Sequence, residues 1–290
     1  MIFHSVADHR SFSRAAEALY ISQPAVSRAV RELEIQVDLP LVERGGGKGF
    51  RLTESGVALY EHARGIFALE RAAMEDIQAR VGSQNGRLVL GASTTIAGYR
   101  LPAYAAGFIG EHPSVSLEIR VGNTQEISRA LVECEIDLAL VEGAVEDARI
   151  HSAHWKDEAL RVFTGKESGR LEDEVWLLRE PGSGTREASE KMLQRYGIVP
   201  RRVIEIGSSE GIARTLASGL GVAMLPELVA DELVNLGRIR PVDFHPVSRP
   251  LFLLLLKERP LLPLVKAFIE ILGTDSAMLG HGREMRIAPG

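Results

Sequence analysis

The sequence predicts two folded parts. The first is an all-helical N-terminal unit that contains a helix-turn-helix and continues into one long helix, and the second is a C-terminal α/β unit of two lobes. Three observations predict this division. Two short amphipathic segments follow each other closely within residues 14–34, and residues 55–84 lack proline and repeat apolar residues every three or four positions. After residue 86, short apolar runs alternate with helical patterns, as in βαβ units.

The second amphipathic segment predicts a helix that begins near Ser22. Serine is well suited to cap a helix, and Pro24 falls in the first turn, where its missing N–H costs nothing. The apolar residues form one stripe that must face a core: Val26, Val30, Leu33 and Val37. A separate polar and basic row is left for solvent: Gln23, Ser27 and Arg31. Such a face is suited to reading the major groove of DNA.

The first amphipathic segment predicts a helix capped by Ser13 that buries Ala15, Ala16 and Leu19. Tyr20 and Ile21 then connect it to the second helix. Because this connection is too short for any other arrangement, it predicts a helix-turn-helix. The small alanines allow the two helices to pack closely.

These residues carry a family resemblance. The pattern AA-x-x-L-x-x-SQPAVS, followed by the pair Leu33-Glu34, closely resembles the helix-turn-helix signature of LysR-type transcriptional regulators. Arg44, the glycine-rich segment 45–50 and RLTESG look like that family's two-stranded wing and the cap of its linker helix. The resemblance implies a winged helix-turn-helix over residues 1–55, a linker and dimerisation helix over 56–84, and an effector-binding domain over 87–290.

The chain departs from the family pattern in three places. Asp38 stands where glycine is usual, Val42 stands where phenylalanine is usual, and the first helix, IFHSVADH, begins several residues late. The late beginning suggests a misplaced start or a truncated first helix. We therefore expect weaker packing beneath the DNA-reading helix.

By this resemblance, two segments contact double-stranded promoter DNA. The helix supplies contacts to base edges and neighbouring phosphates from Ser22, Gln23, Pro24, Ser27, Arg28 and Arg31. The wing supplies contacts to phosphates or the minor groove from Arg44, Lys48 and Arg51. RNA polymerase is a further candidate partner.

The charge distribution excludes a wholly basic nucleic-acid binder, since the net charge is -5 and the pI about 6.0. Residues 1–67 hold eight Lys or Arg and eight Asp or Glu, so even this part is balanced. Residues 19–31 nevertheless carry two arginines and no acid, and residues 44–51 carry three bases and no acid. DNA affinity must therefore come from the placement of these two basic patches.

The cysteine content and the apolar runs predict a soluble cytoplasmic protein with no membrane partner. The single cysteine, Cys134, excludes an internal disulfide, and its neighbours Glu133 and Glu135 disfavour a reactive thiolate. No apolar run suits secretion, and none reaches the roughly 18 residues that would span a bilayer.

Residues 55–84 predict one long helix of about 30 Å or more. Apolar residues recur by threes and fours, interrupted by Glu70: Tyr60, Ala63, Phe67, Met74, Ile77 and Val81. One interpretation is a helix packed on its own unit. The other, which the resemblance implies, is a helix that pairs with its twin in a homodimer or homotetramer and places two reading helices in half-sites about one helical turn apart.

The C-terminal part predicts two α/β lobes. In the first run, strands at 87–92, 115–122 and 136–143 alternate with helices at 101–112 and 125–135. In the second run, strands lie near 159–165, 175–180, 203–207 and 222–226, with helices near 185–197 and 209–221. Strands joined by helical crossovers predict parallel sheets.

The resemblance implies that these Rossmann-like lobes face each other as in periplasmic binding proteins. Lobe I would span about 87–160 and 258–275, and lobe II about 164–250. The chain would cross between them near 160–164 and 250–257, and a helix at 260–272 would return to lobe I. We expect the polar, glycine-rich tail beyond Gly273 to be mobile.

Three hydroxyl-bearing loops follow predicted strands, where open α/β sheets bind ligands. They carry Ser93, Thr94 and Thr95; Ser183, Gly184, Thr185 and Arg186; and Ser208 and Ser209. Hydroxyls, free N–H groups and an arginine at a helix N-terminus make an anion site, whereas ordinary helix capping is the alternative for each loop. Asn123 and Glu142 would line the same cleft, where Glu142 either accepts from a ligand or forms a salt bridge across the hinge.

Within the family, GASTT and EPGSGTR resemble segments of the regulators of carbon fixation and sulfur assimilation. This resemblance implies a small, often anionic effector and no cofactor. We therefore predict a DNA-binding transcriptional regulator whose α/β domain binds such a metabolite and alters promoter binding.

Two other functions stay open. GSSEG at residues 207–211 matches a nucleophile elbow, so a serine hydrolase would use Ser209 with Asp231 or Asp243 and with His245 or His281. Alternatively, the α/β part is a solute-binding or sensor protein whose DNA-binding domain is degenerate. The pair His151 and His154 would need a third ligand to hold a metal. Since no phosphate-loop, dinucleotide, HExxH or paired CxxC motif occurs, we predict neither enzyme nor metal chemistry.

Overall fold

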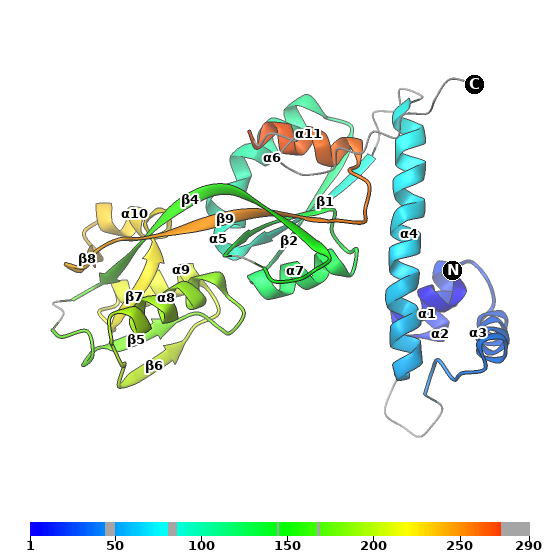
Figure 1. The fold of residues 1–290 in the computed structure, drawn as a ribbon, viewed down its shortest axis with the longest axis horizontal. Helices are drawn as coiled ribbons and strands as arrows, with labels where there is room; N and C mark the ends of the chain where they lie inside the picture. The colour runs from blue at the N-terminus through cyan, green and yellow to red at the C-terminus, as the bar shows by residue number, and fades with distance from the viewer. Residues whose placement is uncertain (44–49, 81–85, 144, 167–168, 274–290) are drawn as a thin grey trace. The chain divides into compact units, whose positions relative to one another are not determined.

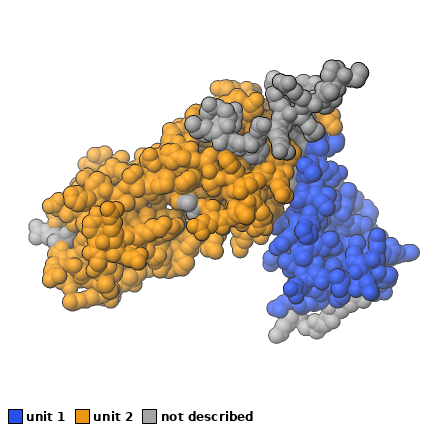
Figure 2. Space-filling model, viewed as in Figure 1, with its two compact units in different colours: residues 1–74 blue, residues 75–290 orange. Residues whose placement is uncertain are grey.

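The computed structural model describes residues 1–43, 50–80, 86–143, 145–166 and 169–273. The chain divides into two compact units, residues 1–74 and residues 75–290 (Figure 2). Val81 of the long helix, the wing residues Arg44 and Lys48, and the tail beyond Gly273 lie outside the described residues. Among the described helices, none is long and apolar enough to cross a membrane.

The first unit is helical, as predicted. Its elements are α1 (Ile2–His9), α2 (Phe12–Ala18), α3 (Gln23–Val37) and the long helix α4 (Glu54–Arg80) (Figure 1). Helices α2 and α3 form the predicted helix-turn-helix. The core of the unit consists of apolar residues on α1, α2, α3 and the segment that follows α3: Phe3, Val6, Ala15, Ala16, Val26, Val30, Leu41 and Val42.

The caps of the helix-turn-helix agree with the prediction for α3 but not for α2. Ser22 caps α3, since its Oγ accepts from the Ala25 N–H at 3.4 Å. Ser11, not Ser13, caps α2, since its Oγ accepts from the Arg14 N–H at 3.3 Å. A capping residue must have extended backbone, and Ser11 has φ -165° whereas Ser13 lies inside the helix. The helix therefore begins two residues earlier than predicted.

Helix α1 forms despite its late beginning in the sequence. It has eight residues, about two turns, and it buries Phe3 and Val6 against the helix-turn-helix core. Helix α3 therefore rests on a packed surface that includes α1.

Two residues near the end of α3, Glu34 and Asp38, fix the path of the segment that follows it. Buried Glu34 accepts from the backbone N–H groups of Leu41 (2.9 Å) and Val42 (3.2 Å), and Val42 bridges to Leu52 where the wing is expected. Asp38 ends α3 in the left-handed region with φ 54°. Because glycine adopts that conformation without strain, the geometry explains why glycine is usual at this position in the family.

The start of α4 is held by Thr53, as the resemblance implied. Its hydroxyl accepts from the Gly56 N–H at 3.0 Å and donates to the Pro40 carbonyl at 2.6 Å. A Cβ on Gly56 would overlap the Leu41 carbonyl oxygen. Glycine is therefore required where α4 passes this segment.

The first interpretation of the long helix, packing on its own unit, describes part of α4, and pairing with a twin stays a prediction. Tyr60 and Phe67 pack against the His4 ring, with ring centroids 5.3 Å and 4.9 Å apart, so part of α4 covers its own unit. Other large apolar side chains on α4 are exposed: Val57, Ile66, Leu69, Met74 and Ile77.

The second unit contains a mixed sheet in place of the parallel sheets predicted (Figure 1). Its nine described strands are β1 (Gly86–Ser93), β2 (Val115–Gly122), β3 (Leu138–Glu142), β4 (Ile150–Thr164), β5 (Val175–Leu178), β6 (Arg202–Glu205), β7 (Val222–Pro226), β8 (Arg240–Pro241) and β9 (Val247–Leu256). Their order is β2-β1-β3-β9-β4-β7-β5-β6, with β8 beside β4. Pairs within each lobe are parallel, namely β1 with β2 and β3, and β5 with β6 and β7.

The antiparallel part of the sheet comes from the two strands that cross between the lobes. Strands β4 and β9 pair from Ile150 and Leu256 to Leu160 and Val247, so the crossings are longer than predicted. The first part of β4 was not predicted because it contains the charged run Lys156, Asp157 and Glu158. Charged runs are not typical of a strand inside a sheet.

Helices cover the sheet in both lobes. Lobe I carries α5 (Thr94–Tyr99), α6 (Leu101–Glu111), α7 (Thr124–Val132) and α11 (Pro263–Ile271), and lobe II carries α8 (Gly184–Arg195), α9 (Ser209–Ala217) and α10 (Glu227–Asn235). Helix α11 packs on α6 and β1, so the last helix returns to lobe I as the resemblance implied. The sequence did not predict α5, α10 or β8, since α5 and α10 directly follow strands with no turn residues between.

Candidate functional site

The predicted DNA-reading row lies on the outer face of α3. Gln23, Arg28 and Arg31 are exposed, and the Gln23 amide donates to the Ser27 hydroxyl at 2.9 Å. Arg28 Nε donates to Glu32 Oε1 at 2.8 Å, with side chains 82% and 63% exposed. The hydrogen bond to Glu32 raises the pKa of Arg28 above its ordinary value, so the guanidinium keeps its charge. These partners are all on α3 and open to solvent, so DNA can replace them.

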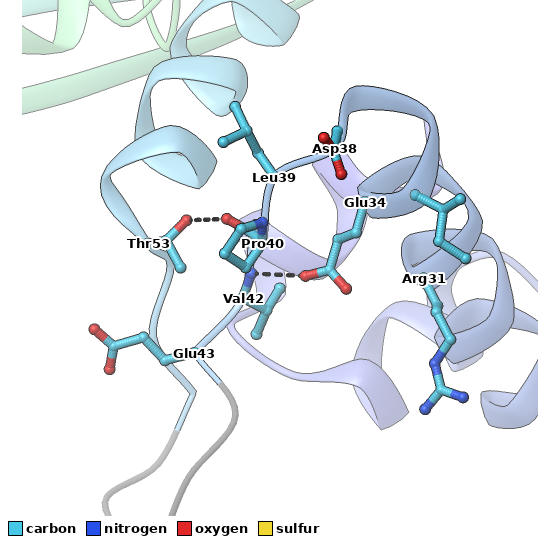
Figure 3. A pocket seen from close by; sticks show the side chains of 9 residues that line it. Arg31, Glu34, Asp38, Leu39, Pro40, Val42, Glu43 and Thr53 are labelled. Atoms are coloured by element: carbon cyan, nitrogen blue, oxygen red, sulfur yellow. Dashed lines mark hydrogen bonds between the residues drawn. The ribbon is translucent and has the colours of Figure 1, made fainter.

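A groove of about 970 Å³ lies at the C-terminal end of α3 (Figure 3). Arg31, from the reading row, contributes to its lining, and the buried carboxylate of Glu34 points toward the Val42 backbone. The lining comes from α3, the segment that follows it and the start of α4: Arg31, Glu34, Ile35, Asp38, Leu39, Pro40, Val42, Glu43 and Thr53. Of the predicted wing contacts, Arg51 is exposed beside this region, and Arg44 and Lys48 are outside the described residues.

The second candidate site lies where the two lobes meet. We define the inter-lobe site as Ser93, Thr94, Thr95, Asn123, Arg179, Glu180 and Ser209. Its centre is Arg179, which directly follows β5 and is 2% exposed in its side chain. Arg179 Nη1 donates to Thr94 Oγ1 in lobe I and to Ser209 Oγ in lobe II, both at 3.0 Å. One buried guanidinium therefore joins hydroxyls from two of the three predicted loops.

Two further donors of Arg179 bind the carboxylate of the next residue, Glu180, in a two-point (fork) arrangement. Nε and Nη2 donate to the two carboxylate oxygens of Glu180, each at 2.8 Å. Burial raises the pKa of Glu180, but the hydrogen bonds and charge of Arg179 more than offset burial, so the pKa lies below its ordinary value. The carboxylate is therefore ionised and satisfies the guanidinium.

Lobe I faces this pair through the beginning of α7. Asn123 Oδ1 accepts from the Glu126 N–H at 2.9 Å in a capping box, and the Asn123 side chain lies close enough to Glu180 to help lower the pKa of that carboxylate. The Gln125 N–H donates to the Gly182 carbonyl at 3.2 Å across the lobes. Asn123, predicted as a site residue, is thus brought to Arg179 and Glu180.

Helix α5 approaches α9 through hydroxyl groups. Thr95 Oγ1 lies 3.4 Å from Ser209 Oγ, and the Tyr99 phenol donates to Glu210. Burial and the Glu210 carboxylate raise the pKa of Tyr99 well above its ordinary value, so the phenol stays neutral and keeps donating. Ser93 Oγ is buried and has no hydrogen-bond partner among the described residues.

The predicted loop at the start of α8 is placed beside lobe I rather than directly on Arg179. A Cβ on Gly184 would lie too close to the Glu142 carbonyl, so glycine allows this approach. Thr185 Oγ1 accepts from Arg249, whereas Arg186 donates to Glu190, Glu205 and the Arg179 carbonyl. Arg186 thus holds the backbone of Arg179, and its direct contact with an effector stays a prediction, as does that of Ser183.

Glu142 lies in a buried ionic network on the crossing strands. Arg249 of β9 donates to Glu158 of β4 at 2.6 Å and lies 3.5 Å from Glu142 of β3. Arg100 completes the network, with Nη2 3.2 Å from Glu158. Of the two roles predicted for Glu142, the structure contains the salt bridge across the hinge.

Within the part of the chain that the structure describes, the hydrogen bonds of the GSSEG serines do not include a histidine. Ser208 caps α9 by accepting from the Gly211 N–H at 3.2 Å. The described hydrogen bonds of Ser209 are to Arg179 and Thr95, where a nucleophile would need a histidine base. His281 lies outside the described residues.

The histidine pair His151 and His154 lies on β4. His154 lies 3.1 Å from Asp157 on the exposed side of β4, and the described residues contain no cluster of three His, Cys, Asp or Glu side chains placed for a metal.

Sequence reasoning missed five charged residues that join the lobes: Arg100, Glu158, Arg179, Glu180 and Arg249. Within the ionic network their partners lie between 58 positions (Arg100 and Glu158) and 107 positions (Arg249 and Glu142) away in the chain. Arg179 and Thr94 lie 85 positions apart, whereas Arg179 and Glu180 are neighbours. The one local signal was an Arg-Glu pair directly after the strand VWLL.

Known family sequences match both units. Residues 1–57 match the bacterial regulatory helix-turn-helix protein, lysR family, and residues 82–277 match the LysR substrate binding domain. The RuBisCO operon transcriptional regulator of Acidithiobacillus ferrooxidans is 31% identical over 288 residues, which cover 95% of this chain and 93% of that protein. The match agrees with the expected resemblance to regulators of carbon fixation.

Two solved structures share the fold. A full-length OxyR variant from Pseudomonas aeruginosa has a TM-score of 0.71 and 26% identity, and the alignment covers 93% of this chain and 91% of OxyR. The Synechocystis PCC6803 CcmR regulatory domain, solved in complex with 2-PG, has a TM-score of 0.58 and 27% identity, over 65% of this chain and 96% of that domain.

Proposed function

This chain belongs to the LysR family of DNA-binding transcriptional regulators with an effector-binding domain, and we propose that a small anionic metabolite bound at the inter-lobe site changes how it binds promoter DNA. The observation that carries the proposal is Arg179, a buried guanidinium held by hydroxyls from both lobes. A buried arginine with this surrounding is suited to a carboxylate or a phosphate. The likeness to a regulatory domain solved with 2-PG supports a ligand of this size in the α/β unit.

We propose that α3 and the wing make the DNA contacts. The residues are Ser22, Gln23, Pro24, Ser27, Arg28 and Arg31 on the helix, and Arg44, Lys48 and Arg51 on the wing. The support for the helix is its exposed polar row, whose hydrogen bonds are short-range and replaceable. Base contacts from such a helix give specificity, and phosphate contacts fix its register.

We propose that α4 pairs with its twin in a homodimer, and that dimers assemble into a tetramer. The exposed apolar side chains of α4 support pairing, since Ile66, Leu69, Met74 and Ile77 would be covered by a second copy. We also propose that the protein works in the cytoplasm of a bacterium. RNA polymerase, which is present at the same promoter, is proposed as a further partner.

Binding at the inter-lobe site can alter DNA binding because Arg179 and Asn123 link the lobes. A ligand that binds one arrangement of the lobes better than another shifts the population toward it, and typical couplings between sites are about 1–3 kcal/mol. The ligand would act through residues that already join the lobes: Thr94, Asn123, Arg179 and Ser209.

The first experiment is a thermal-shift screen of phosphorylated, sulfur-containing and carboxylate metabolites, with 2-PG included, on the full chain. We then expect Arg179→Gln and Thr95→Ala to lose the shift and the ligand's effect in a gel-shift assay with the upstream intergenic DNA, while both still bind that DNA. Arg195→Gln, on the exposed face of α8, is the matched control and should respond as the wild type does. A normal ligand response from Arg179→Gln would remove the inter-lobe site from effector binding.

A further inference from the structure

The arginine at the centre of the inter-lobe site is already neutralised by its neighbour in the chain. Arg179 and Glu180 are joined by two parallel hydrogen bonds of 2.8 Å, one from Nε and one from Nη2. This two-point geometry is the one by which arginine binds carboxylates and phosphates in general. The edge of Arg179 best suited to an anionic ligand is therefore occupied.

The two partners differ in how firmly they are held. The Arg179 side chain is 2% exposed and is also bound by Thr94 and Ser209, whereas the Glu180 side chain is 24% exposed. The carboxylate can thus turn toward solvent while the guanidinium stays in place.

The surroundings of the Glu180 carboxylate offer donors beyond Arg179. The Asn123 side chain from lobe I lies close enough to the Glu180 carboxylate to help lower its pKa. Ser93, which precedes Thr94 in the chain, has a buried Oγ without a hydrogen-bond partner among the described residues, although buried hydroxyls are normally paired. An anion in place of Glu180 would gain the fork of Arg179 and the nearby Asn123 amide.

We propose that Glu180 is an internal counter-anion, which occupies the fork of Arg179 until the effector's carboxylate or phosphate displaces it. The inference rests on the proposed function, because it concerns the same site. It adds which group neutralises Arg179 before the effector binds. A buried arginine cannot lose its partner without a large cost, so exchange of one anion for another is the favourable route.

Displacement has a consequence for the lobes. The Asn123 side chain of lobe I lies close to the Glu180 carboxylate of lobe II and helps to lower its pKa, and this contact is lost when Glu180 leaves. The incoming anion then forms the bridge in its place. Ligand binding is thereby tied to an exchange of inter-lobe contacts, and the apparent affinity is lowered by the competition.

The test uses the full chain and two probes, inorganic phosphate and 2-PG, with binding measured by isothermal titration calorimetry. Glu180→Gln keeps the shape of the side chain and removes its charge. We expect its affinity for the probes to rise by about tenfold or more over the wild type. We also expect its melting temperature to be lower than the wild type's in anion-poor buffer and to recover on addition of phosphate.

Two further variants separate the outcomes. Glu187→Gln removes a carboxylate from the first turn of α8, where Glu187 pairs with Lys191, and should leave the affinity unchanged. Arg179→Gln should abolish binding. Equal affinity in the wild type and Glu180→Gln would overturn the counter-anion and leave the anion site standing. Binding by Glu180→Gln alone would support the counter-anion, whereas no binding by either protein, with no phosphate rescue of Glu180→Gln, would overturn both proposals.

Discussion

Two arginine–glutamate pairs, one on the DNA-reading helix and one on the crossing strands, use the same residue types in opposite environments. Arg28 and Glu32 lie one helical turn apart at 2.8 Å, with side chains 82% and 63% exposed. Arg249 and Glu158 lie 91 positions apart in the chain at 2.6 Å, with side chains 5% and 2% exposed. The first pair is open to exchange with water or DNA, whereas the second is fixed by the packing around it.

The difference in exposure matches the different tasks of the two regions. A reading surface must give up its own hydrogen bonds when DNA arrives, so its pairs are weak and exposed. The region between the lobes must hold charged groups away from water, so each carries several partners and its loss leaves another charge buried. Arg249, for example, meets Glu142, Glu158 and Thr185 together.

The largest effect should follow from Arg249→Met. The substitution leaves Glu142 and Glu158 buried with Arg100 as their remaining cation, and breaking a buried pair costs about 3–5 kcal/mol. Urea unfolding of the full chain followed by tryptophan fluorescence measures this loss, because both tryptophans, Trp155 and Trp176, belong to the second unit.

The matched control for this prediction is Arg149→Met. Arg149 pairs with Asp147 at 2.8 Å, but its side chain is mostly exposed, so we expect a loss of about 1 kcal/mol or less. If Arg249→Met cost no more than Arg149→Met, the contrast between buried and exposed pairs would not hold in this protein.

The next effect concerns DNA affinity rather than stability. Arg28→Ala should leave folding nearly unchanged, since an exposed pair at i and i+4 contributes about 0.5 kcal/mol or less, and should weaken promoter binding by about 1–3 kcal/mol. Glu32→Gln is the control, because it frees Arg28 without removing it and should bind at least as tightly as the wild type. Fluorescence anisotropy with labelled promoter DNA measures both, and unchanged affinity for Arg28→Ala would exclude it from the reading face.

A smaller effect is expected at the end of the reading helix. Asp38 holds φ 54°, which glycine adopts without strain, so Asp38→Gly should stabilise the first unit by about 1 kcal/mol or less. Asp38→Ala should have the opposite sign, since alanine lacks both the freedom of glycine and the polar side chain of aspartate. Hydrogen exchange of peptides from α1–α3 reports the change, because the first unit contains no tryptophan. Equal protection in both variants would show that the backbone at Asp38 is not strained.

The same contrast explains how much the sequence could predict. The helix-turn-helix, the cap at Ser22 and the long helix depend on residues a few positions apart, and these predictions were confirmed. Two of the three hydroxyl loops, those of Thr94 and Ser209, meet at the junction of the lobes, because strand ends in one sheet meet at a common edge. Arg179 could not be identified, since its importance comes from Thr94, 85 positions away, and from burial that no local pattern encodes. The mixed sheet was missed for the same reason, because β9 lies between β3 and β4 through pairing over about 90 residues or more.

The smallest effect should come from His4, a half-buried titratable group of the first unit. Burial against Tyr60 and Phe67 lowers the pKa of His4 below its ordinary value of 6.5, although Asp8 partly opposes the shift. Below pH 6.5 His4 therefore binds a proton more readily in the unfolded chain than in the folded chain. The contribution of neutral His4 to the stability of the first unit is fully present above pH 6.5 and is lost as the pH falls below that value. His4→Phe keeps an aromatic ring and should remove this part of the decrease, which is seen as a smaller difference in hydrogen exchange of α1–α3 between about pH 7.5 and about pH 5.5, after correction for the intrinsic exchange rates. If His4→Phe and the wild type lose protection equally, the carboxylates of the unit, and not the packing of α1 on α4, set its response to acid.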